Sequence, residues 1–254
     1  MRKLIVLAIG AAILIAAQTR ADDGAAVKEL LGRAAKAIGG PEKAAKLNNV
    51  TFKGKGQVTE GGQTADMLFD ISTQDFDRIR ADITIIENGR THQALLVITP
   101  DKIWAKDSDR NKVDELPKEI TALVQQFYLA MRLPSIPAAL SGSKSFQLGH
   151  GGETKVDDRP AVILRVSRKE HPDIDIYYDA KTGLPLKSET QIKGPNESEE
   201  KKYEFKFSEF KDVDGVKHYG KIKILRDGKD LFEMELSDAK LIEKFEAGTF
   251  DKPQ

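Results

Sequence analysis

The fold class is indicated most directly by residues 161–192, which read AVILRVSRKEHPDIDIYYDAKTGLPLKSETQI. Apolar and polar side chains alternate at 162–167 and at 174–178, the period of two that places every second side chain on one buried face of a strand. Asp179 can hydrogen-bond its own backbone at the start of a turn, and Gly183 can take the positive φ of a bulged hairpin loop. A third strand follows and opens with a proline, which is tolerated at a strand start or on an edge. These residues predict three successive antiparallel strands.

The alternation continues on both sides of this stretch. Further strands are expected at 50–58, 65–71, 76–86, 91–98, 103–104, 146–148, 203–207, 216–226 and 229–237. The pairs Asn88-Gly89, Asp214-Gly215 and Asp227-Gly228 are typical of tight hairpins between such strands. Gly54 and Gly56 fall on an inward-facing row, which predicts strong curvature there. The chain is therefore expected to contain about 11 antiparallel strands.

Two segments have helical rather than strand periodicity. Apolar side chains recur at i, i+3 and i+4 within 25–38 and again from Pro117 to Arg132. Pro134 and Pro137 interrupt the second segment, so a helical insertion is expected at about 117–140. A long twisted sheet either closes into a barrel or stays open and needs helices against its inner face. The two helices favour a mainly β protein with α-helices, an unclosed antiparallel half-barrel of about 11 strands with helices covering the concave face.

The N-terminus has the pattern of an export signal. Met1-Arg2-Lys3 precedes an apolar run from Leu4 to Ala17, and Thr19-Arg20-Ala21 offers small residues for cleavage. The alternative, a retained membrane anchor, is weakened because a bilayer-spanning helix needs about 20 apolar residues. We therefore expect a signal peptide at 1–21, a single domain at 22–254, and a periplasmic or secreted protein.

Charge and cysteine content exclude several function classes. The chain has 40 basic and 40 acidic side chains, and removal of Arg2, Lys3 and Arg20 leaves 37 against 40, or about −3. A nucleic-acid-binding protein would show a basic excess, so no nucleic-acid partner is expected. The chain has no cysteine, which excludes disulfides, thiol chemistry and a lipid-modified N-terminal cysteine.

No catalytic or metal-binding motif stands out. The histidines are scattered singly, at His92, His150, His171 and His218. His171, Asp173 and Asp175 could share a strand face as a weak cation site, although a solvated face is the favoured interpretation. Residues 149–152, GHGG, lack the helix and lysine of a phosphate-binding loop and are interpreted as a turn. We expect no enzyme activity, no metal and no cofactor.

Large apolar side chains suggest a cavity. Phe127, Tyr128 and Met131 form a stripe on the inserted helix, which either packs as ordinary core or covers an incompletely filled sheet. Trp104 is either a core anchor or a cavity wall. The candidate lipid-binding residues are Met67, Phe69, Trp104, Phe127, Tyr128 and Met131. The polar and proline-rich flanks of the inserted helix favour a gate over this cavity rather than a fixed strut.

The order of elements resembles the LolA-like superfamily of periplasmic lipoprotein carriers. This superfamily includes mycobacterial lipid-binding lipoproteins and regulators that bind envelope-stress sensors. The residues that carry the resemblance are Phe76-Asp77-Arg78-Ile79-Arg80, Pro100-Asp101-Lys102-Ile103-Trp104, the segment 117–140, the run from Tyr178 to Pro185, and Phe250-Asp251-Lys252-Pro253.

The resemblance implies a half-barrel covered by helices and a non-catalytic carrier of a lipid or an acylated lipoprotein. The carriers keep an arginine that ties the helical lid to the sheet, and Arg78 and Arg80 are the candidates for it here. We expect a monomer. The alternative is an envelope sensory or scaffolding module that binds a protein partner through a sheet edge or through the polar loop 193–200.

Overall fold

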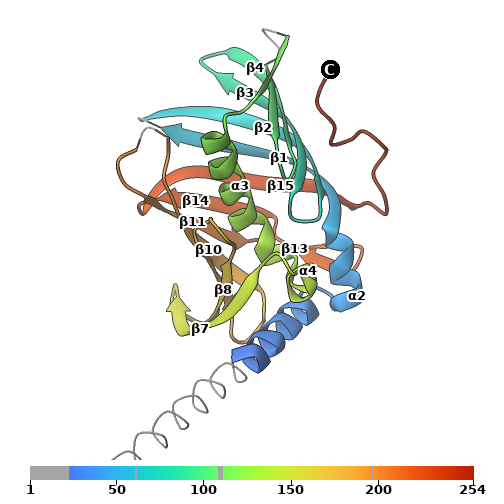
Figure 1. Cartoon of the computed structure of the whole chain (residues 1–254), viewed down its shortest axis with the longest axis vertical. Coiled ribbons are helices and arrows are strands. Elements are labelled where there is room, and N and C mark those ends of the chain that lie inside the picture. The colour runs from blue at the N-terminus through green and yellow to red at the C-terminus, as the bar shows by residue number, and fades with distance from the viewer. Residues whose placement is uncertain (1–22, 61, 108–110, 196) are drawn as a thin grey trace, which may run out of the picture.

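The computed structural model describes residues 23–60, 62–107, 111–195 and 197–254, so the predicted signal peptide lies outside the described residues (Figure 1). The helices are a leading helix at 23–37, α2 (Pro41–Ala44), η1 (Ala45–Asn48), α3 (Lys118–Arg132), η2 (Leu133–Ser135) and α4 (Pro137–Gly142). The strands are β1 (Asn49–Glu60), β2 (Gln63–Gln74), β3 (Arg78–Glu87), β4 (Arg90–Ile98), β5 (Ile103–Asp107), β6 (Lys112–Glu115), β7 (Gln147–Val156), β8 (Arg159–Ser167), β9 (Ile174–Asp179), β10 (Pro185–Ile192), β11 (Lys201–Ser208), β12 (Lys211–Val213), β13 (Val216–His218), β14 (Lys221–Arg226) and β15 (Lys229–Leu241). The protein is thus mainly β with few helices.

Within the described residues, thirteen strands form one antiparallel sheet in the order β6-β5-β4-β3-β2-β1-β15-β14-β11-β10-β9-β8-β7. Its end strands β6 and β7 do not pair with each other in this order, so the sheet is not closed into a barrel. The predicted count of about 11 strands was too low. The charged four-residue β6 has no readable alternation, and the expected strand 216–226 divides into β13 and β14, with β13 pairing with β12 outside the main sheet.

The predicted hairpins are confirmed by their backbone angles. Asn88 and Gly89 have φ values of 49° and 75°, Asp214 and Gly215 have 53° and 78°, and Asp227 and Gly228 have 49° and 77°. Positive φ at both central residues matches the right-handed twist of the flanking strands. Asp157 and Asp158 adopt the same geometry, at 48° and 63°, without a glycine. Aspartate tolerates the left-handed region of backbone angles, so this turn forms without a glycine. Because no glycine marks it in the sequence, the β7–β8 hairpin was not predicted.

The turn at the centre of 161–192 is also confirmed. The Asp179 carboxylate accepts hydrogen bonds from the backbone N–H groups of Lys181 (2.9 Å) and Thr182 (2.7 Å). Gly183 has a φ of 74°, and a Cβ at this position would lie 2.9 Å from the Arg33 carbonyl oxygen of the leading helix. Glycine is therefore required both for the turn and for the close approach of the leading helix.

The prediction of a turn at 149–152 is wrong. These residues lie within β7, and the register of the β7–β8 pair shifts between His150 and Glu153. A β-bulge absorbs the extra residue there, and a Cβ on Gly151 would collide with the Ile163 side chain at 2.6 Å. The glycines thus mark a bulge in an edge strand.

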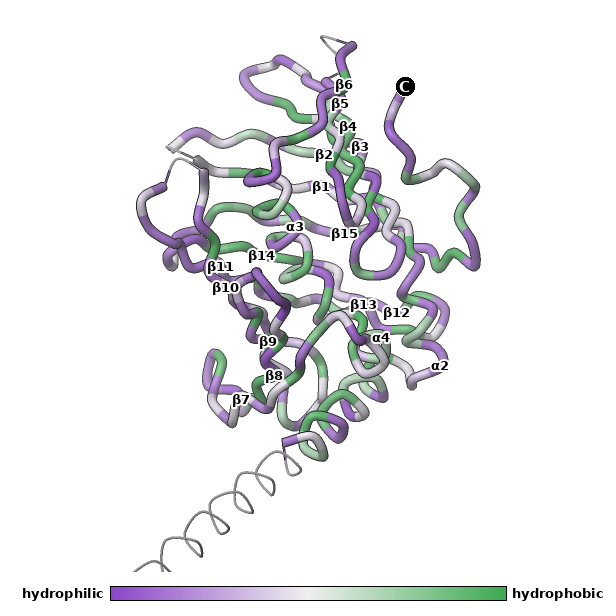
Figure 2. Tube along the Cα trace, viewed as in Figure 1, coloured by the Kyte–Doolittle hydropathy of each residue, from purple (hydrophilic) through white to green (hydrophobic). Residues whose placement is uncertain are grey.

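One contiguous hydrophobic core joins the leading helix, α3 and one face of the sheet. The segment 25–38 contributes the predicted apolar stripe. Val27, Leu30, Leu31, Ala34 and Ile38 belong to this core, and Ala35 is also buried. Apolar and polar segments alternate along the strands in Figure 2, as expected when one face of each strand is buried. None of the helices in the described ranges is both long enough and apolar enough to cross a membrane.

Gly54 and Gly56 lie where β1 approaches β15 most closely. A Cβ on Gly56 would overlap the carbonyl oxygen of Glu233 and lie 3.2 Å from the Met234 Cα. Because both contacts are to backbone, Gly56→Ala is expected to lower the free energy of unfolding by about 1 to 3 kcal/mol in urea denaturation. Gly32→Ala is the control: its Cβ meets nothing within 4 Å on the exposed side of the leading helix. It should stabilise the protein by about 0.5 to 1 kcal/mol, and similar losses in both variants would contradict the prediction.

Candidate functional site

Helix α3 runs across one face of the sheet, which we call the α3 face (Figure 1). The Phe127 ring meets the Phe205 ring of β11 edge-on, with centroids 4.9 Å apart. The Ser188 hydroxyl of β10 donates to the Ala130 carbonyl at 2.5 Å. Gln126 donates to the Thr190 hydroxyl at 2.8 Å, so aromatic packing and polar contacts both join α3 to the sheet.

The C-terminal end of α3 is held by Arg132, which is only 3% exposed. Its guanidinium donates to the backbone carbonyls of Leu47, Asn48 (3.4 Å) and Asp75 (3.2 Å) and to the Ser135 hydroxyl (3.0 Å). These acceptors belong to η1, η2 and the β2–β3 turn. Arg132 therefore ties α3 to three other segments.

The sequence interpretation missed Arg132 as a tether. The spacing of Arg132 in the sequence could have indicated its burial. Arg132 follows Tyr128 by four residues, so it lies on the same side of the helix as the apolar stripe of α3. A cation in the last helical turn also interacts favourably with the helix dipole. Its hydrogen-bond acceptors lie far away in the chain and could not be identified without the fold.

Tyr219 and His218 support the same end of α3. The Tyr219 hydroxyl donates to the Met131 carbonyl at 3.1 Å. The His218 ring contacts the Tyr219 ring at a tilt of 38°, with centroids 4.2 Å apart, and its Nδ1 lies 2.7 Å from the Tyr219 carbonyl oxygen. Burial and the neighbouring Arg132 charge lower the pKa of His218 to about 4. His218 is therefore neutral at pH 7.

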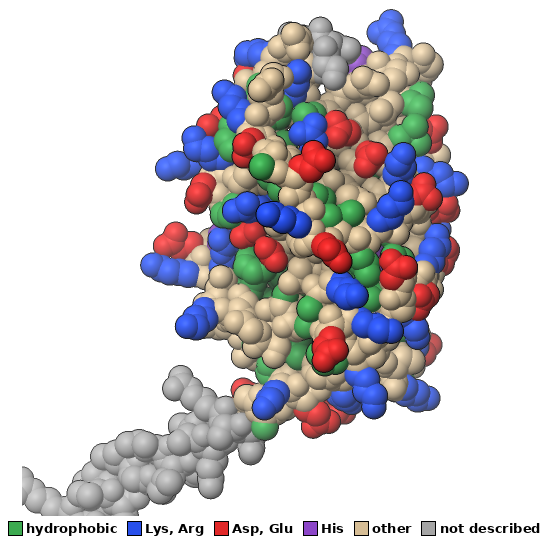
Figure 3. All heavy atoms as spheres, turned by 90° about the vertical axis from the view of Figure 1, so that its right-hand side faces the viewer, with side chains coloured by type: hydrophobic (Ala, Val, Ile, Leu, Met, Phe, Trp, Pro, Cys, Tyr) green, Lys and Arg blue, Asp and Glu red, His purple; other side chains and the backbone are tan. Residues whose placement is uncertain are grey.

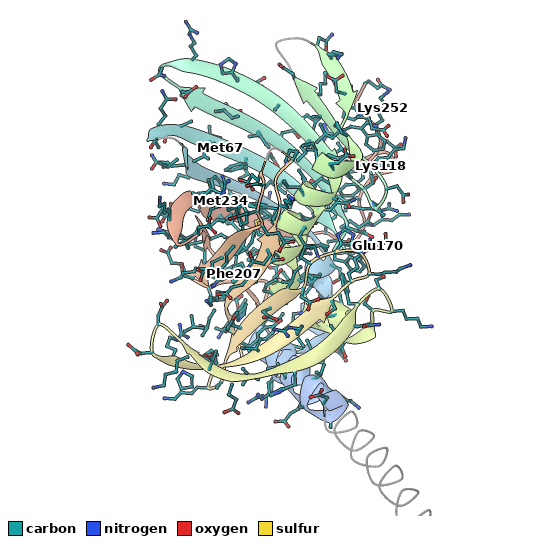
Figure 4. The ribbon with its side chains drawn as sticks, turned by 60° about the vertical axis from the view of Figure 1, so that its left-hand side comes forward. Met67, Lys118, Glu170, Phe207, Met234 and Lys252 are labelled. Atoms are coloured by element: carbon teal, nitrogen blue, oxygen red, sulfur yellow. The ribbon has the colours of Figure 1, made fainter. Side chains whose placement is uncertain are left out.

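A strip of partly exposed apolar side chains continues from the core along the α3 face, toward the β1–β2 and β3–β4 hairpins. The register places its members on one face of β15, β1, β2, β3 and β4. We define this apolar strip as Val58, Ala65, Met67, Ile83, Ile85, Ala94, Leu96 and Phe232. Figure 4 shows Met67 and Met234 on neighbouring parts of this sheet region. Phe232 joins the strip to the core, because its ring meets the buried Phe69 ring edge-on with centroids 5.8 Å apart.

The structure brings five of the six predicted lipid-binding residues into one apolar cluster. Phe69 and Tyr128 are buried in the core, whereas Met67, Phe127 and Met131 are partly buried against it. Burial raises the pKa of the Tyr128 hydroxyl, so this group stays protonated.

Trp104 lies apart from that cluster. It pairs with Val97 and Glu115, and the register places it on the face opposite the α3 face. There it lines a groove of about 690 Å³ together with the C-terminal segment 244–252. The hairpin that carries Trp104 was predicted, but the face on which its side chain lies was not.

The two arginines predicted to tether the lid lie away from α3. Arg78 is exposed and lines the same groove as Trp104. The Arg80 guanidinium lies 3.4 Å from the Asp82 carboxylate on its own strand. In the part of the chain that the structure describes, no hydrogen bond or ion pair joins either arginine to α3, whereas Arg132 makes such contacts from within the helix.

The weak cation site considered at His171 is occupied by a cationic side chain. Arg165 forms two 2.8 Å hydrogen bonds with the Asp175 carboxylate and lies 3.9 Å from Asp173. Burial and the neighbouring Arg168 lower the pKa of His171. Across the described ranges, no group of three or more His, Cys, Asp or Glu residues could hold a metal ion. Basic and acidic side chains are interspersed over the molecular face in Figure 3, as the near-zero net charge predicts.

No family model and no curated protein matches the chain. Solved structures do match at 12% identity. A putative outer membrane lipoprotein-sorting protein domain from Vibrio parahaemolyticus has a TM-score of 0.56 and covers 83% of this chain and 94% of its own. A DUF1329 family protein from Desulfovibrio piger has 0.55, covering 89% and 97%, and a LolA superfamily protein from Nitrosomonas europaea has 0.54, covering 83% and 95%. At this identity the matches establish a shared fold.

Proposed function

We propose that this chain, which has the LolA-like fold, is an exported, non-catalytic carrier that shields the acyl chains of a lipid or an acylated lipoprotein on its α3 face. In this proposal, residues 1–21 are a cleaved signal peptide and 22–254 form one monomeric domain in the periplasm or outside the cell. The leading helix and α3 cover the concave face of the open sheet. The apolar strip and Phe127 contact the ligand.

The observation that carries this proposal is the apolar strip. Its eight side chains are partly exposed and come from five neighbouring strands. Four of them pack against the buried core: Met67, Ile83, Leu96 and Phe232. Burial of one methylene group is worth about 0.8 kcal/mol. About six methylenes would therefore contribute about 5 kcal/mol, which corresponds to a dissociation constant below 1 mM before any polar contact. The strip can thus bind an acyl chain without a charged anchor.

The Vibrio match, described as a lipoprotein-sorting protein domain, supports a carrier role and export. It does not favour the alternative of a sensory module that binds a protein partner. An enzyme is not supported either, because the matched proteins are not described as enzymes.

Two adjacent residues of β2 provide the test. Met67 belongs to the apolar strip, whereas Leu68 points to the opposite face and is 49% exposed. Met67→Asp is expected to weaken binding of a fluorescent fatty acid at pH 7.5 by more than about tenfold, since a charge on the strip opposes burial of an acyl chain. Leu68→Asp carries the same charge on the other face and should leave the affinity unchanged. Circular dichroism would establish that both variants fold.

Two results would count against the carrier. One is absence of fatty-acid binding by the wild-type protein, together with lipid-free protein in native mass spectrometry after expression in a lipid-containing host. The other is an equal loss of affinity in the Met67→Asp and Leu68→Asp variants.

A further inference from the structure

The ring of His218 packs against the side chain that holds the last turn of α3. Tyr219 contacts His218 through its ring and through the 2.7 Å contact of its carbonyl oxygen, and its hydroxyl donates to the Met131 carbonyl of α3. On its other side the His218 ring lies 5.9 Å from the Phe52 ring of β1. His218 is 3% exposed, so any charge it acquires is enclosed by these aromatic rings.

The buried charge that acts on His218 is also positive. Arg132, the residue after Met131, is buried, and in the described part of the chain its acceptors are three backbone carbonyls and one hydroxyl, so no carboxylate shares its hydrogen bonds. A second cation beside it would be opposed both by repulsion and by loss of hydration. The arrangement therefore tolerates only the neutral form of His218.

Apart from the buried Tyr219 and Arg132, the titratable groups near His218 are exposed to solvent. Lys211 and Asp212 lie on β12, where Lys211 pairs directly with His218, and Asp238 lies on β15. Together with His218 they line a cavity of about 240 Å³. Lys217 precedes His218 and is also exposed. Solvent screens these carboxylates, so they offset the Arg132 charge only weakly.

We infer that protonation of His218 releases the C-terminal end of α3 from Tyr219 and from the carbonyls that Arg132 contacts, and that acid thereby exposes the α3 face and releases its ligand. The release of α3 stands on these contacts, whereas the release of the ligand rests on the proposed carrier function. In this inference, the gate predicted from the flanks of α3 opens in acid.

Proton linkage sets how the stability of the anchored state of α3 changes with pH. Anchored His218 titrates near pH 4, whereas an exposed histidine titrates near 6.5. The anchored state is fully stabilised above pH 6.5, and this stabilisation is lost as the pH falls toward 4. The ratio of released to anchored α3 should rise on acidification, with a limit of about 300-fold below pH 4.

Hydrogen exchange measured by mass spectrometry tests the release directly. Protection of residues 118–132 would be compared with that of β14 between pH 7.5 and 4.5, after correction for the intrinsic pH dependence of exchange. In the wild-type protein α3 should lose at least about tenfold more protection than β14. His218→Gln should remove this difference, whereas His92→Gln, a change at an exposed histidine on β4, should retain it.

Parallel loss of protection in α3 and β14, or an unchanged acid response in His218→Gln, would overturn the inference. If His218→Gln does not fold, Tyr219→Phe replaces it, since it removes only the hydroxyl that reaches Met131. In this variant, protection of α3 relative to β14 should already be lower at pH 7.5. If α3 of the variant is as protected at pH 7.5 as α3 of the wild-type protein, the inference is also overturned.

Release of a fluorescent long-chain alcohol, which has no titrating group, separates the two proposals. If the wild-type protein binds the alcohol at pH 7.5 and loses it over the pH range in which α3 loses protection, the result supports both the carrier function and the His218 mechanism. Acid release of α3 in a protein that never binds the alcohol contradicts the carrier function and leaves the His218 mechanism in place. If the alcohol stays bound after α3 is released, the proposed release of ligand in acid is contradicted.

Discussion

Replacing Arg132 by methionine is expected to lower the free energy of unfolding by about 3 to 5 kcal/mol. The methionine side chain fills similar space, but the carbonyls of Leu47, Asn48 and Asp75 lose a donor in a buried setting. Each unsatisfied buried acceptor costs about 1 to 3 kcal/mol. Urea denaturation followed by circular dichroism would measure the loss.

Two further variants sharpen this test. Arg78→Met changes an exposed arginine and should alter stability by no more than about 0.5 kcal/mol. Arg132→Lys keeps the charge but loses the planar fork that reaches acceptors on three segments, so it should fall between the wild-type protein and the methionine variant. Equal stability of the Arg132→Met and Arg78→Met proteins would show that Arg132 is no structural tether.

The second large effect is expected for Phe205→Ala, with a loss of about 3 to 5 kcal/mol. Phe205 is fully buried on β11 beneath α3, where its ring meets Phe127. Phe127→Ala should cost less, about 1 to 3 kcal/mol, because this ring is only partly buried before truncation. Chemical denaturation of both variants provides the comparison.

Fatty-acid binding to the same two proteins separates core from ligand surface. Phe127→Ala should change the affinity, since this ring lies at the α3 face beside the partly buried Tyr203, whereas folded Phe205→Ala should bind nearly as the wild-type protein does. A Phe127→Ala protein that is strongly destabilised with unchanged binding would identify the α3 stripe as ordinary core.

Features that depend on neighbouring residues could be predicted from the sequence. Side-chain alternation predicted most strands, and the Asn-Gly and Asp-Gly pairs predicted three hairpins whose φ values are positive at both central residues. The turn that follows Asp179 and the helix ending at Arg132 were predicted in the same way. All of these are set by the local backbone preferences and periodicity of short segments.

The face occupied by Trp104 and the role of Arg132 depend on the folded sheet and could not be predicted from the sequence. A period of two separates the faces of a strand but does not say which face meets the core, and a shift of one residue in register exchanges them. The Arg132 acceptors at Asp75, Asn48 and Leu47 are 57, 84 and 85 residues away. A buried arginine is stable only when such distant carbonyls converge on it, and that convergence is a property of the folded sheet rather than of any local segment.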